Sequence, residues 1–242
     1  MLPASEGRLF YWFVKYLLRP VFRLLFQPVV TGQEHIPPEG GALLASNHLS
    51  MCDSLFLPVM TRRRVTFLAK NEYFTGRGLK GRAKAGFVRG TGLIPLDRTD
   101  CDTAASGLSA GTRAVARGRL LGVYPEGTRS PDGRLYRGKT GVARIALETG
   151  VPIVPVAMIG TGLVQPIGRS MPSIARVEIH IGPPIRPPSP ASGAEATWQA
   201  RELTEQVMSA IAALSGQERV DVDCAGHKDE LIAVPVGAGP VA

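Results

Sequence analysis

Residues 41–60 read GALLASNHLSMCDSLFLPVM, and this stretch contains the unit on which the predicted fold is built. The run 41–46 is short and apolar, as a strand buried inside a sheet would be. A helix is predicted over residues 53–60, with Pro58 marking its end. A strand followed directly by a helix is the repeating unit of α/β proteins. The polar residues 47–52 therefore fall at the carboxyl end of a predicted strand.

The same alternation continues along the chain and predicts one α/β domain, with a mostly parallel central sheet flanked by helices. Further strands are expected over residues 65–69, 92–96, 120–124, 151–158 and 176–181, and helices over residues 100–117 and 138–148. A last amphipathic helix is predicted from apolar residues at helical spacing, namely Leu203, Val207, Ile211 and Leu214. We assign the domain to residues 29–215 and expect a loosely ordered tail over residues 216–242.

The composition limits the partners that the protein can have. Its 242 residues suffice for one large domain with a substantial core. A formal net charge of +8 at pH 7 favours an anionic partner, such as a membrane surface, nucleic acid or a phosphorylated substrate. No groove-reading or base-stacking motif accompanies this charge, so we expect no nucleic acid among the partners. The three cysteines are scattered and form no CxxC pair, which argues against a disulfide framework and a cysteine metal site.

The N-terminal segment 5–28 is predicted to be an amphipathic helical segment that docks onto a membrane surface. Its basic residues share one face of a helical wheel, and aromatic and aliphatic residues fill the rest; the basic residues are Arg8, Lys15, Arg19 and Arg23. Pro20 is expected to divide the segment into two short helices. Because basic residues interrupt the apolar run, we do not expect a membrane-spanning helix. The alternative interpretation is a helix that covers the globular core.

A histidine and a carboxylate follow the first strand at a spacing that suits proton transfer. His48 lies at the carboxyl end of the strand, where open α/β sheets usually place ligands. Asp53 begins the next helix and can turn back to accept a hydrogen bond from one ring nitrogen, which leaves the other nitrogen to accept a hydroxyl proton. His48 is therefore a candidate general base, oriented by Asp53. A structural histidine, or a carboxylate that only caps its helix, is the alternative.

A second polar segment, residues 124–130, reads YPEGTRS and suits an anionic ligand. Its glycine-containing turn can present backbone N–H groups, and Arg129 can bind a phosphate group through two hydrogen bonds. Residues 60–98 add ten basic residues against two acidic ones, a local charge of +8. This excess indicates either a solvated basic face or a surface that attracts lipid headgroups or the phosphates of coenzyme A. The two segments together predict proton abstraction from a hydroxyl whose phosphate is held nearby.

Two other functions have some support in the sequence. Residues 107–111 match the GxSxG pattern of serine hydrolases. That mechanism needs Ser109 on a strand-to-helix turn, whereas we expect it inside the helix 100–117. The second alternative is a non-catalytic protein that binds anionic membranes, which the charge alone would explain.

Four blocks in order resemble the 1-acylglycerol-3-phosphate acyltransferase family, within the wider glycerophospholipid acyltransferases. Its NHxSxxD block is matched by Asn47, His48, Ser50 and Asp53. The other blocks are matched by GLIPLDR at residues 92–98, YPEGTRS at residues 124–130 and VPIVPV at residues 151–156. The similarity covers about residues 30–185.

The resemblance implies a direct acyl transfer. His48 would deprotonate the sn-2 hydroxyl of lysophosphatidic acid, which attacks an acyl thioester and gives phosphatidic acid, while Asp53 orients His48. It implies a phosphate site formed by Arg98, Glu126, Gly127, Thr128 and Arg129, with Lys70 as a further candidate. No cofactor and no metal are implied, because the donor, acyl-CoA or acyl carrier protein, is a co-substrate.

Some features of the expected enzyme stay open in the sequence. Another lysophospholipid, such as lysophosphatidylinositol, is the alternative acceptor. The expected location is the cytoplasmic face of the cell membrane, as a peripheral or monotopic protein. Contact with an anionic membrane surface is expected through residues 8–28 and the basic residues in 60–98.

Overall fold

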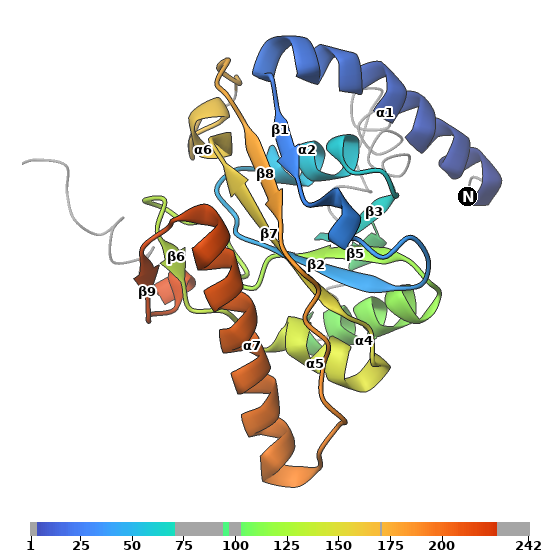
Figure 1. Ribbon diagram of the computed structural model, residues 1–242, viewed down its shortest axis with the longest axis vertical. Coiled ribbons are helices and arrows are strands. Elements are labelled where there is room, and N and C mark those ends of the chain that lie inside the picture. The colour runs from blue at the N-terminus through green and yellow to red at the C-terminus, as the bar shows by residue number, and fades with distance from the viewer. Residues whose placement is uncertain (1–3, 71–93, 97–102, 170, 227–242) are drawn as a thin grey trace, which may run out of the picture.

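The computed structural model describes residues 4–70, 94–96, 103–169 and 171–226 (Figure 1). Its seven-stranded sheet has the order β1-β8-β7-β2-β5-β3-β4, in which β7 and β8 pair antiparallel and the other neighbours pair parallel. These strands are β1 (Val29–Thr31), β2 (Ala42–Ser46), β3 (Val65–Lys70), β4 (Ile94–Leu96), β5 (Leu120–Val123), β7 (Ile153–Ile159) and β8 (Glu178–Ile181). This confirms the predicted α/β class with a mostly parallel sheet.

Helices cover both faces of the sheet (Figure 1). The larger ones are α1 (Ala4–Phe26), α2 (Asp53–Met60), α4 (Thr103–Ala116), α5 (Gly141–Thr149) and α7 (Gly193–Ser215). Short elements are η1 (Gln33–His35), α6 (Thr161–Val164) and a two-stranded parallel ladder of β6 (Leu135–Tyr136) and β9 (Arg219–Val220). The short elements, and the edge strand β1, fall where the sequence pattern predicts no element, because they are too brief to show a period.

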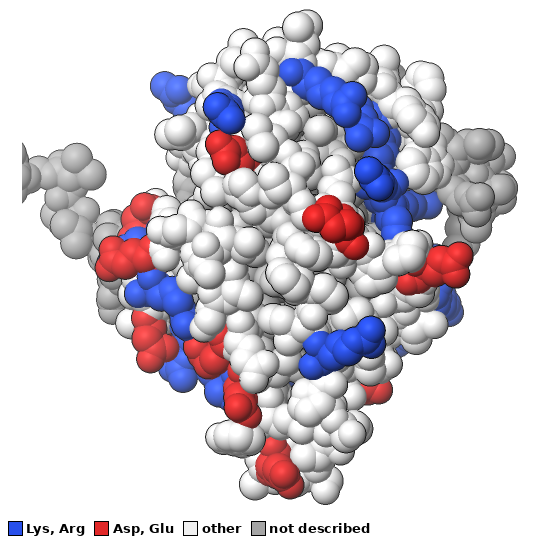
Figure 2. Space-filling view, viewed as in Figure 1, with Lys and Arg blue, Asp and Glu red and all other residues white. Residues whose placement is uncertain are grey.

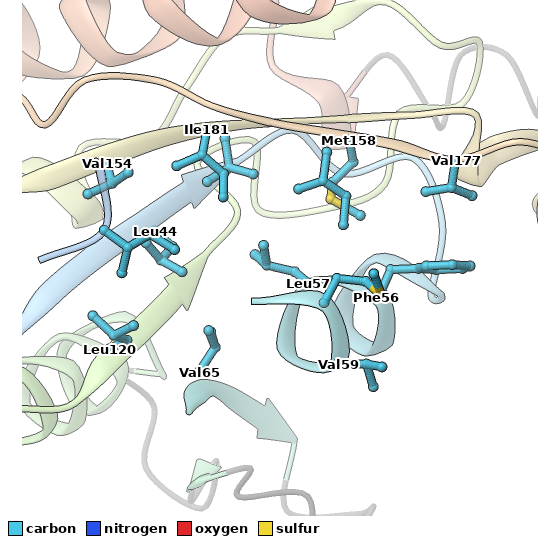
Figure 3. Close-up of a cluster of buried hydrophobic side chains, with 14 of the residues drawn as sticks. Leu44, Phe56, Leu57, Val59, Val65, Leu120, Val154, Met158, Val177 and Ile181 are labelled. Carbon is cyan, nitrogen blue, oxygen red and sulfur yellow. The ribbon is translucent and has the colours of Figure 1, made fainter. Parts of the chain in front are cut away.

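The central strand β2 places its side chains alternately in two hydrophobic cores. Leu44 faces the core formed with α1 and α2, which is drawn in Figure 3. Leu43 faces the opposite core, formed with α4, α5 and α7. Both leucines are fully buried, because β2 lies between β7 and β5 with helices above and below. The turn after β2 therefore starts from a rigid position.

Helix α1 runs without interruption through Pro20, whereas the sequence analysis expected two short helices. Pro20 lies on the exposed side of α1, as does Tyr16 one turn earlier. The carbonyl group of Tyr16, which a proline cannot bond, therefore faces solvent rather than the core. Packing of residues on both sides of Pro20 keeps the helix continuous.

The core-facing side of α1 packs on α2 and corrects the expectation that the basic stripe faces outward. Phe22 and Phe26 lie against Phe56 of α2, with ring centroids 4.6 and 5.1 Å apart. Lys15 is buried, and its Nζ donates to the carbonyl oxygen of Thr61 just after α2. Burial lowers the pKa of Lys15 to about 8. One side of α1 thus covers the core, as the alternative interpretation proposed.

The opposite side of α1 presents large apolar side chains to solvent, including Phe13, Tyr16, Leu17, Val21 and Leu24. Phe13 is 64% exposed and Leu24 is 77% exposed. In the part of the chain that is described, no helix has the length and hydropathy needed to cross a bilayer.

The first part of the predicted loose tail is packed against the domain. Gln217 accepts a hydrogen bond from Asn47, β9 pairs with β6, and Cys224 is completely buried. The expectation of loose order from residue 216 therefore does not hold for residues 216–226, and residues 227–242 lie outside the described residues.

Candidate active site

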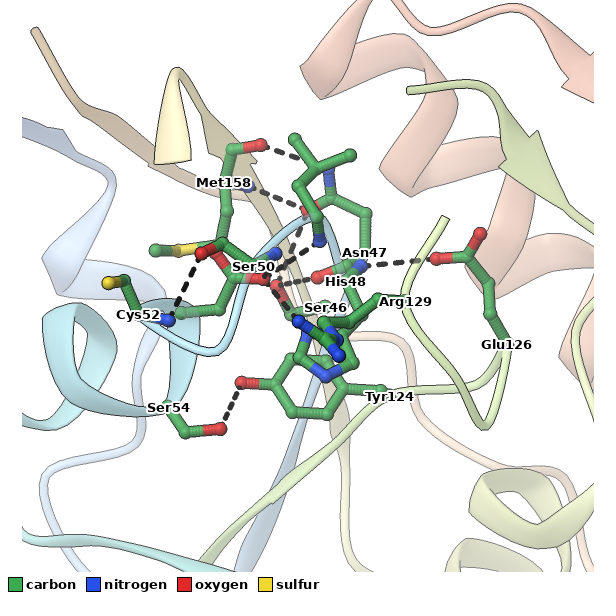
Figure 4. A network of polar contacts seen from close by, with 12 residues as sticks. Ser46, Asn47, His48, Ser50, Cys52, Ser54, Tyr124, Glu126, Arg129 and Met158 are labelled. Atoms are coloured by element: carbon green, nitrogen blue, oxygen red, sulfur yellow. Dashed lines mark hydrogen bonds and ion pairs between the residues drawn. The ribbon is translucent and has the colours of Figure 1, made fainter. Parts of the chain in front are cut away.

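The turn between β2 and α2 carries His48, which is labelled in Figure 4, and its ring contacts Asp53. The carboxylate of Asp53 is fully buried, and its Oδ2 lies 2.9 Å from Nδ1 of the histidine. The same oxygen accepts the backbone N–H groups of Leu49 and Ser50, at 2.8 and 2.9 Å. These bonds fix the carboxylate in the turn before the helix. The Asp53 side chain thus does not cap α2, because its partners are the histidine ring and two N–H groups that precede the helix.

The bond to Asp53 determines which nitrogen of His48 is available for chemistry. With a proton on Nδ1, the other ring nitrogen, Nε2, carries the lone pair. Among the described residues, Nε2 has no hydrogen-bond partner, and the His48 side chain remains 16% exposed. A nitrogen in this state can accept a proton from a bound hydroxyl group.

Tyr124 holds the plane of the histidine ring, a role that the sequence analysis did not assign. The rings of His48 and Tyr124 are stacked, with centroids 3.8 Å apart and an interplanar angle of 8°. The tyrosine ring is backed by Phe67, and its hydroxyl group lies 2.8 Å from Oγ of Ser54. Burial raises the pKa of Tyr124 well above its ordinary value, so this hydroxyl stays neutral. The tyrosine was visible in the YPEGTR motif, but no sequence period indicates stacking.

Glu126 stabilises the loop after β5 through backbone hydrogen bonds. The sequence analysis had instead placed it among the phosphate ligands. Its carboxyl group is fully buried. Oε2 accepts the backbone N–H of His48 at 3.1 Å, and Oε1 accepts that of Tyr136 at 2.9 Å. Burial raises the pKa of Glu126 to about 7, although the two N–H groups oppose this shift. Because both oxygens are occupied, Glu126 acts as a positioning residue.

The turn that follows brings Arg129 to the same edge of the sheet. Gly127 adopts a φ of +74°, which favours glycine, and its N–H donates to the carbonyl of Tyr124. The N–H of Ser130, which follows Arg129, donates to the carbonyl of His48 at 2.8 Å and so joins the two turns. In the described part of the chain, no carboxylate lies within ion-pair distance of Arg129. The guanidinium is therefore available to an anionic group.

The remaining predicted phosphate ligands are only partly described. Thr128 lies in the turn and is half-buried. Lys70 ends β3, at the same edge of the sheet, but its side chain is outside the described part. Arg98 lies outside the described residues altogether. In the basic segment 60–98, Arg63 donates to the carbonyl groups of Pro37, Gly40 and Gly118, which is a structural role.

Asn47 joins the catalytic turn to the neighbouring strand, and the sequence analysis gave it no role of its own. Its side chain accepts the backbone N–H of Met158 at 2.7 Å and donates to the carbonyl of the same residue at 2.9 Å. Asn47 thereby continues the pairing of β2 with β7 by one more residue. It holds the backbone at His48 where the strand ends.

The hydrolase alternative lacks the geometry that it needs. Ser109 lies inside α4, on its exposed side, and not on a turn after a strand. A nucleophilic serine of the GxSxG type must stand on such a turn.

Comparisons with known proteins agree with this geometry. A family model described as Acyltransferase matches residues 27–159, which include the whole of the His48 and Arg129 turns. The solved structure of the 1-acyl-sn-glycerophosphate (LPA) acyltransferase PlsC from Thermotoga maritima is similar with a TM-score of 0.64. It is 26% identical in sequence, and the match covers 93% of this chain and 80% of that one.

Curated relatives carry the name 1-acyl-sn-glycerol-3-phosphate acyltransferase. A chloroplastic one from Arabidopsis thaliana is 31% identical over 140 residues, which cover 57% of this chain and 38% of that protein. One from Borreliella burgdorferi is 28% identical over 137 residues, which cover 55% of this chain and 51% of that protein. The chain thus spans about half or less of the length of these relatives. The chain belongs to the acyltransferase family.

Proposed function

We propose that the protein transfers a fatty acyl chain from acyl-CoA to the sn-2 hydroxyl group of 1-acylglycerol-3-phosphate and so forms phosphatidic acid. The observation that carries the proposal is the bond from Nδ1 of His48 to Oδ2 of Asp53, which leaves Nε2 without a partner among the described residues, while the N–H of Ser130 joins the Arg129 turn to the carbonyl of His48. A base on a turn adjoining that of a cation with no carboxylate partner among the described residues suits a substrate with both a hydroxyl and a phosphate group. The names of the relatives point to the same acceptor.

In the proposed reaction, Nε2 of His48 takes the proton from the sn-2 hydroxyl while that oxygen attacks the carbonyl carbon of the thioester. The resulting tetrahedral intermediate collapses by breaking the C–S bond. The leaving thiolate then takes the proton back from the imidazolium, so His48 returns to its starting state. Asp53 stabilises the imidazolium between these two steps. No covalent acyl-enzyme is required.

The acceptor phosphate is proposed to bind at the loop after β5. Arg129 would supply two parallel hydrogen bonds, and the turn at Gly127 lets the backbone approach an anion closely. Lys70 and Arg98 are kept as further proposed ligands. Glu126 is left out of the set, because both its oxygens already bind backbone N–H groups.

The protein is proposed to act at a membrane surface, on the cytoplasmic face. The outward face of α1 carries Phe13, Tyr16, Leu17, Val21 and Leu24, which suits insertion into the interface of a bilayer. Figure 2 shows Lys and Arg side chains along the part of the surface where α1 lies in Figure 1. These charges favour anionic headgroups. The acceptor and the product are lipids, so docking would bring the active site to its substrate.

The acceptor and the donor are tested together with purified protein. The protein is incubated with a panel of lysolipids, including lysophosphatidic acid and lysophosphatidylinositol, and with acyl-CoA or acyl carrier protein as thioester, and the products are identified by mass. We expect phosphatidic acid from lysophosphatidic acid and acyl-CoA. In Arg129→Ala, use of the phosphate-bearing acceptor falls, while acylation of a monoacylglycerol is affected much less. Turnover of no lysolipid would refute the function.

Docking is tested separately by sedimentation with vesicles that contain phosphatidylglycerol. The substitution Leu17→Asp on α1 should reduce the bound fraction strongly. The matched control is Trp198→Asp on α7, which changes a similarly exposed apolar side chain on another helix. Equal binding of both variants would exclude α1 as the docking face. Vesicle binding by a protein without any turnover would instead favour the non-catalytic alternative.

A further inference from the structure

The chain after α7 returns to the active-site edge of the sheet. Residues 216–224, here called the C-terminal strap, run beside residues 126–139, here called the anion loop. Leu135 of the anion loop donates its N–H to the carbonyl of Glu218, and Arg137 donates its N–H to the carbonyl of Val222. Two ion pairs, Arg137 with Asp221 and Lys139 with Asp223, join the same segments at the surface. The strap therefore follows the anion loop along its outer side.

One residue of the strap connects both catalytic segments. The side chain of Gln217 accepts a hydrogen bond from Nδ2 of Asn47 at 2.7 Å. Its own Nε2 donates to the carbonyl of Gly133 in the anion loop. Asn47 immediately precedes His48, and Gly133 lies four residues after Arg129. A single amide thus links the segment that carries the base to the segment that carries the cation.

The end of the strap contacts the backbone of Arg129. Cys224 is completely buried, and its thiol lies 3.6 Å from the carbonyl oxygen of Arg129. On the other side, the N–H of Ser130 donates to the carbonyl of His48. The backbone at Arg129 is therefore held between the catalytic turn and the strap.

We propose that the C-terminal strap positions the anion loop relative to His48, and that Gln217 is the positioning residue. The inference rests on the proposed function, since it concerns the distance between the base and the group that binds the acceptor phosphate. Gln217 touches neither the hydroxyl nor the phosphate of the acceptor; it acts through Asn47 and Gly133. Without its bond to Gln217 the anion loop would hold the acceptor phosphate less firmly, and without the bond to Asn47 the hydroxyl would also lie out of reach of Nε2.

Two substitutions separate the two bonds of Gln217. Gln217→Glu keeps an oxygen for Asn47 but loses the donor to Gly133, whereas Gln217→Ala loses both. The control is Gln199→Ala, because Gln199 makes the same two kinds of bond, from the N–H of Ala191 and to the carbonyl of Ser189, away from the site. Steady-state kinetics with lysophosphatidic acid and with monoacylglycerol are combined with amide hydrogen exchange of the anion loop.

We expect Gln217→Glu to raise the KM for lysophosphatidic acid by about five- to tenfold with little change in kcat, as loss of one hydrogen bond would produce. Gln217→Ala should also lower kcat, and exchange in residues 126–139 should be faster in both variants. Gln199→Ala should behave as wild type in every assay. An unchanged KM in Gln217→Glu, or unchanged exchange in the anion loop, overturns the proposal. If the wild-type protein acylates no lysolipid, the proposed function is refuted instead. Hydrogen exchange of the anion loop in the Gln217 variants then tests by itself whether the C-terminal strap positions that loop.

Discussion

The substitution Glu126→Gln tests how the buried carboxyl group couples the active-site loop to pH. Burial raises the pKa of Glu126 from 4.5 to about 7 in the folded protein. A carboxyl group with a raised pKa prefers its neutral form on folding, so its favourable contribution is complete below about pH 4.5 and is lost as pH rises to about 7. At about 1.4 kcal/mol for each unit of displacement, the change amounts to about 3 kcal/mol.

The measurement is the free energy of unfolding in urea, for wild type and Glu126→Gln, from roughly pH 5 to pH 8. Titrations elsewhere in the chain are common to both proteins and cancel in the difference. We expect wild type to lose about 2–3 kcal/mol relative to the variant across this range. The variant itself should be less stable at low pH, because its NH₂ group faces a backbone N–H. A difference that stays constant with pH would show that Glu126 does not titrate in this range.

Three further pairs of substitutions test the turn, the core and the histidine stack. Gly127→Ala should cost about 1–2 kcal/mol in the free energy of unfolding and weaken use of phosphate-bearing acceptors, because φ is positive there. The control Gly141→Ala has open space around the added methyl group and should be neutral or slightly stabilising. Phe56→Ala should cost about 3–5 kcal/mol in denaturant unfolding, whereas Phe13→Ala on the exposed side of α1 should cost little. Tyr124→Leu should lower kcat while Tyr124→Phe, which keeps the stacked ring, retains most of it; equal losses would mean that the hydroxyl group matters and the ring does not.

The sequence was sufficient to predict most of the sheet and the contact between His48 and Asp53. Apolar runs such as β2 and β7 are buried on both faces, and that environment leaves a clear compositional pattern. The bond between His48 and Asp53 was also predictable, because the two residues are close in sequence and separated by one turn. The spacing of residues in the sequence is enough to predict a contact when the two residues are only a few positions apart.

Contacts between distant segments were not predictable in the same way. Helix α1 is apolar on two opposite sides, so the spacing of its apolar residues does not indicate which side packs on α2. Lys15 was therefore expected at the surface, whereas it is buried. The bond between Gln217 and Asn47 joins residues 170 positions apart, in a segment without periodicity. Glu126 was placed in the phosphate site by the resemblance of its motif to the family, whereas its buried side chain binds two backbone N–H groups.

The most direct test of the central claim is kcat for His48→Ala at saturating lysophosphatidic acid and acyl-CoA, with the fold checked by circular dichroism. If Nε2 removes the hydroxyl proton, kcat should fall by about a hundredfold to ten-thousandfold, the usual contribution of a general base. The KM for the acceptor should change little, because Arg129, which His48→Ala leaves in place, is the proposed ligand of the phosphate. A variant that keeps kcat near the wild-type value would contradict the account.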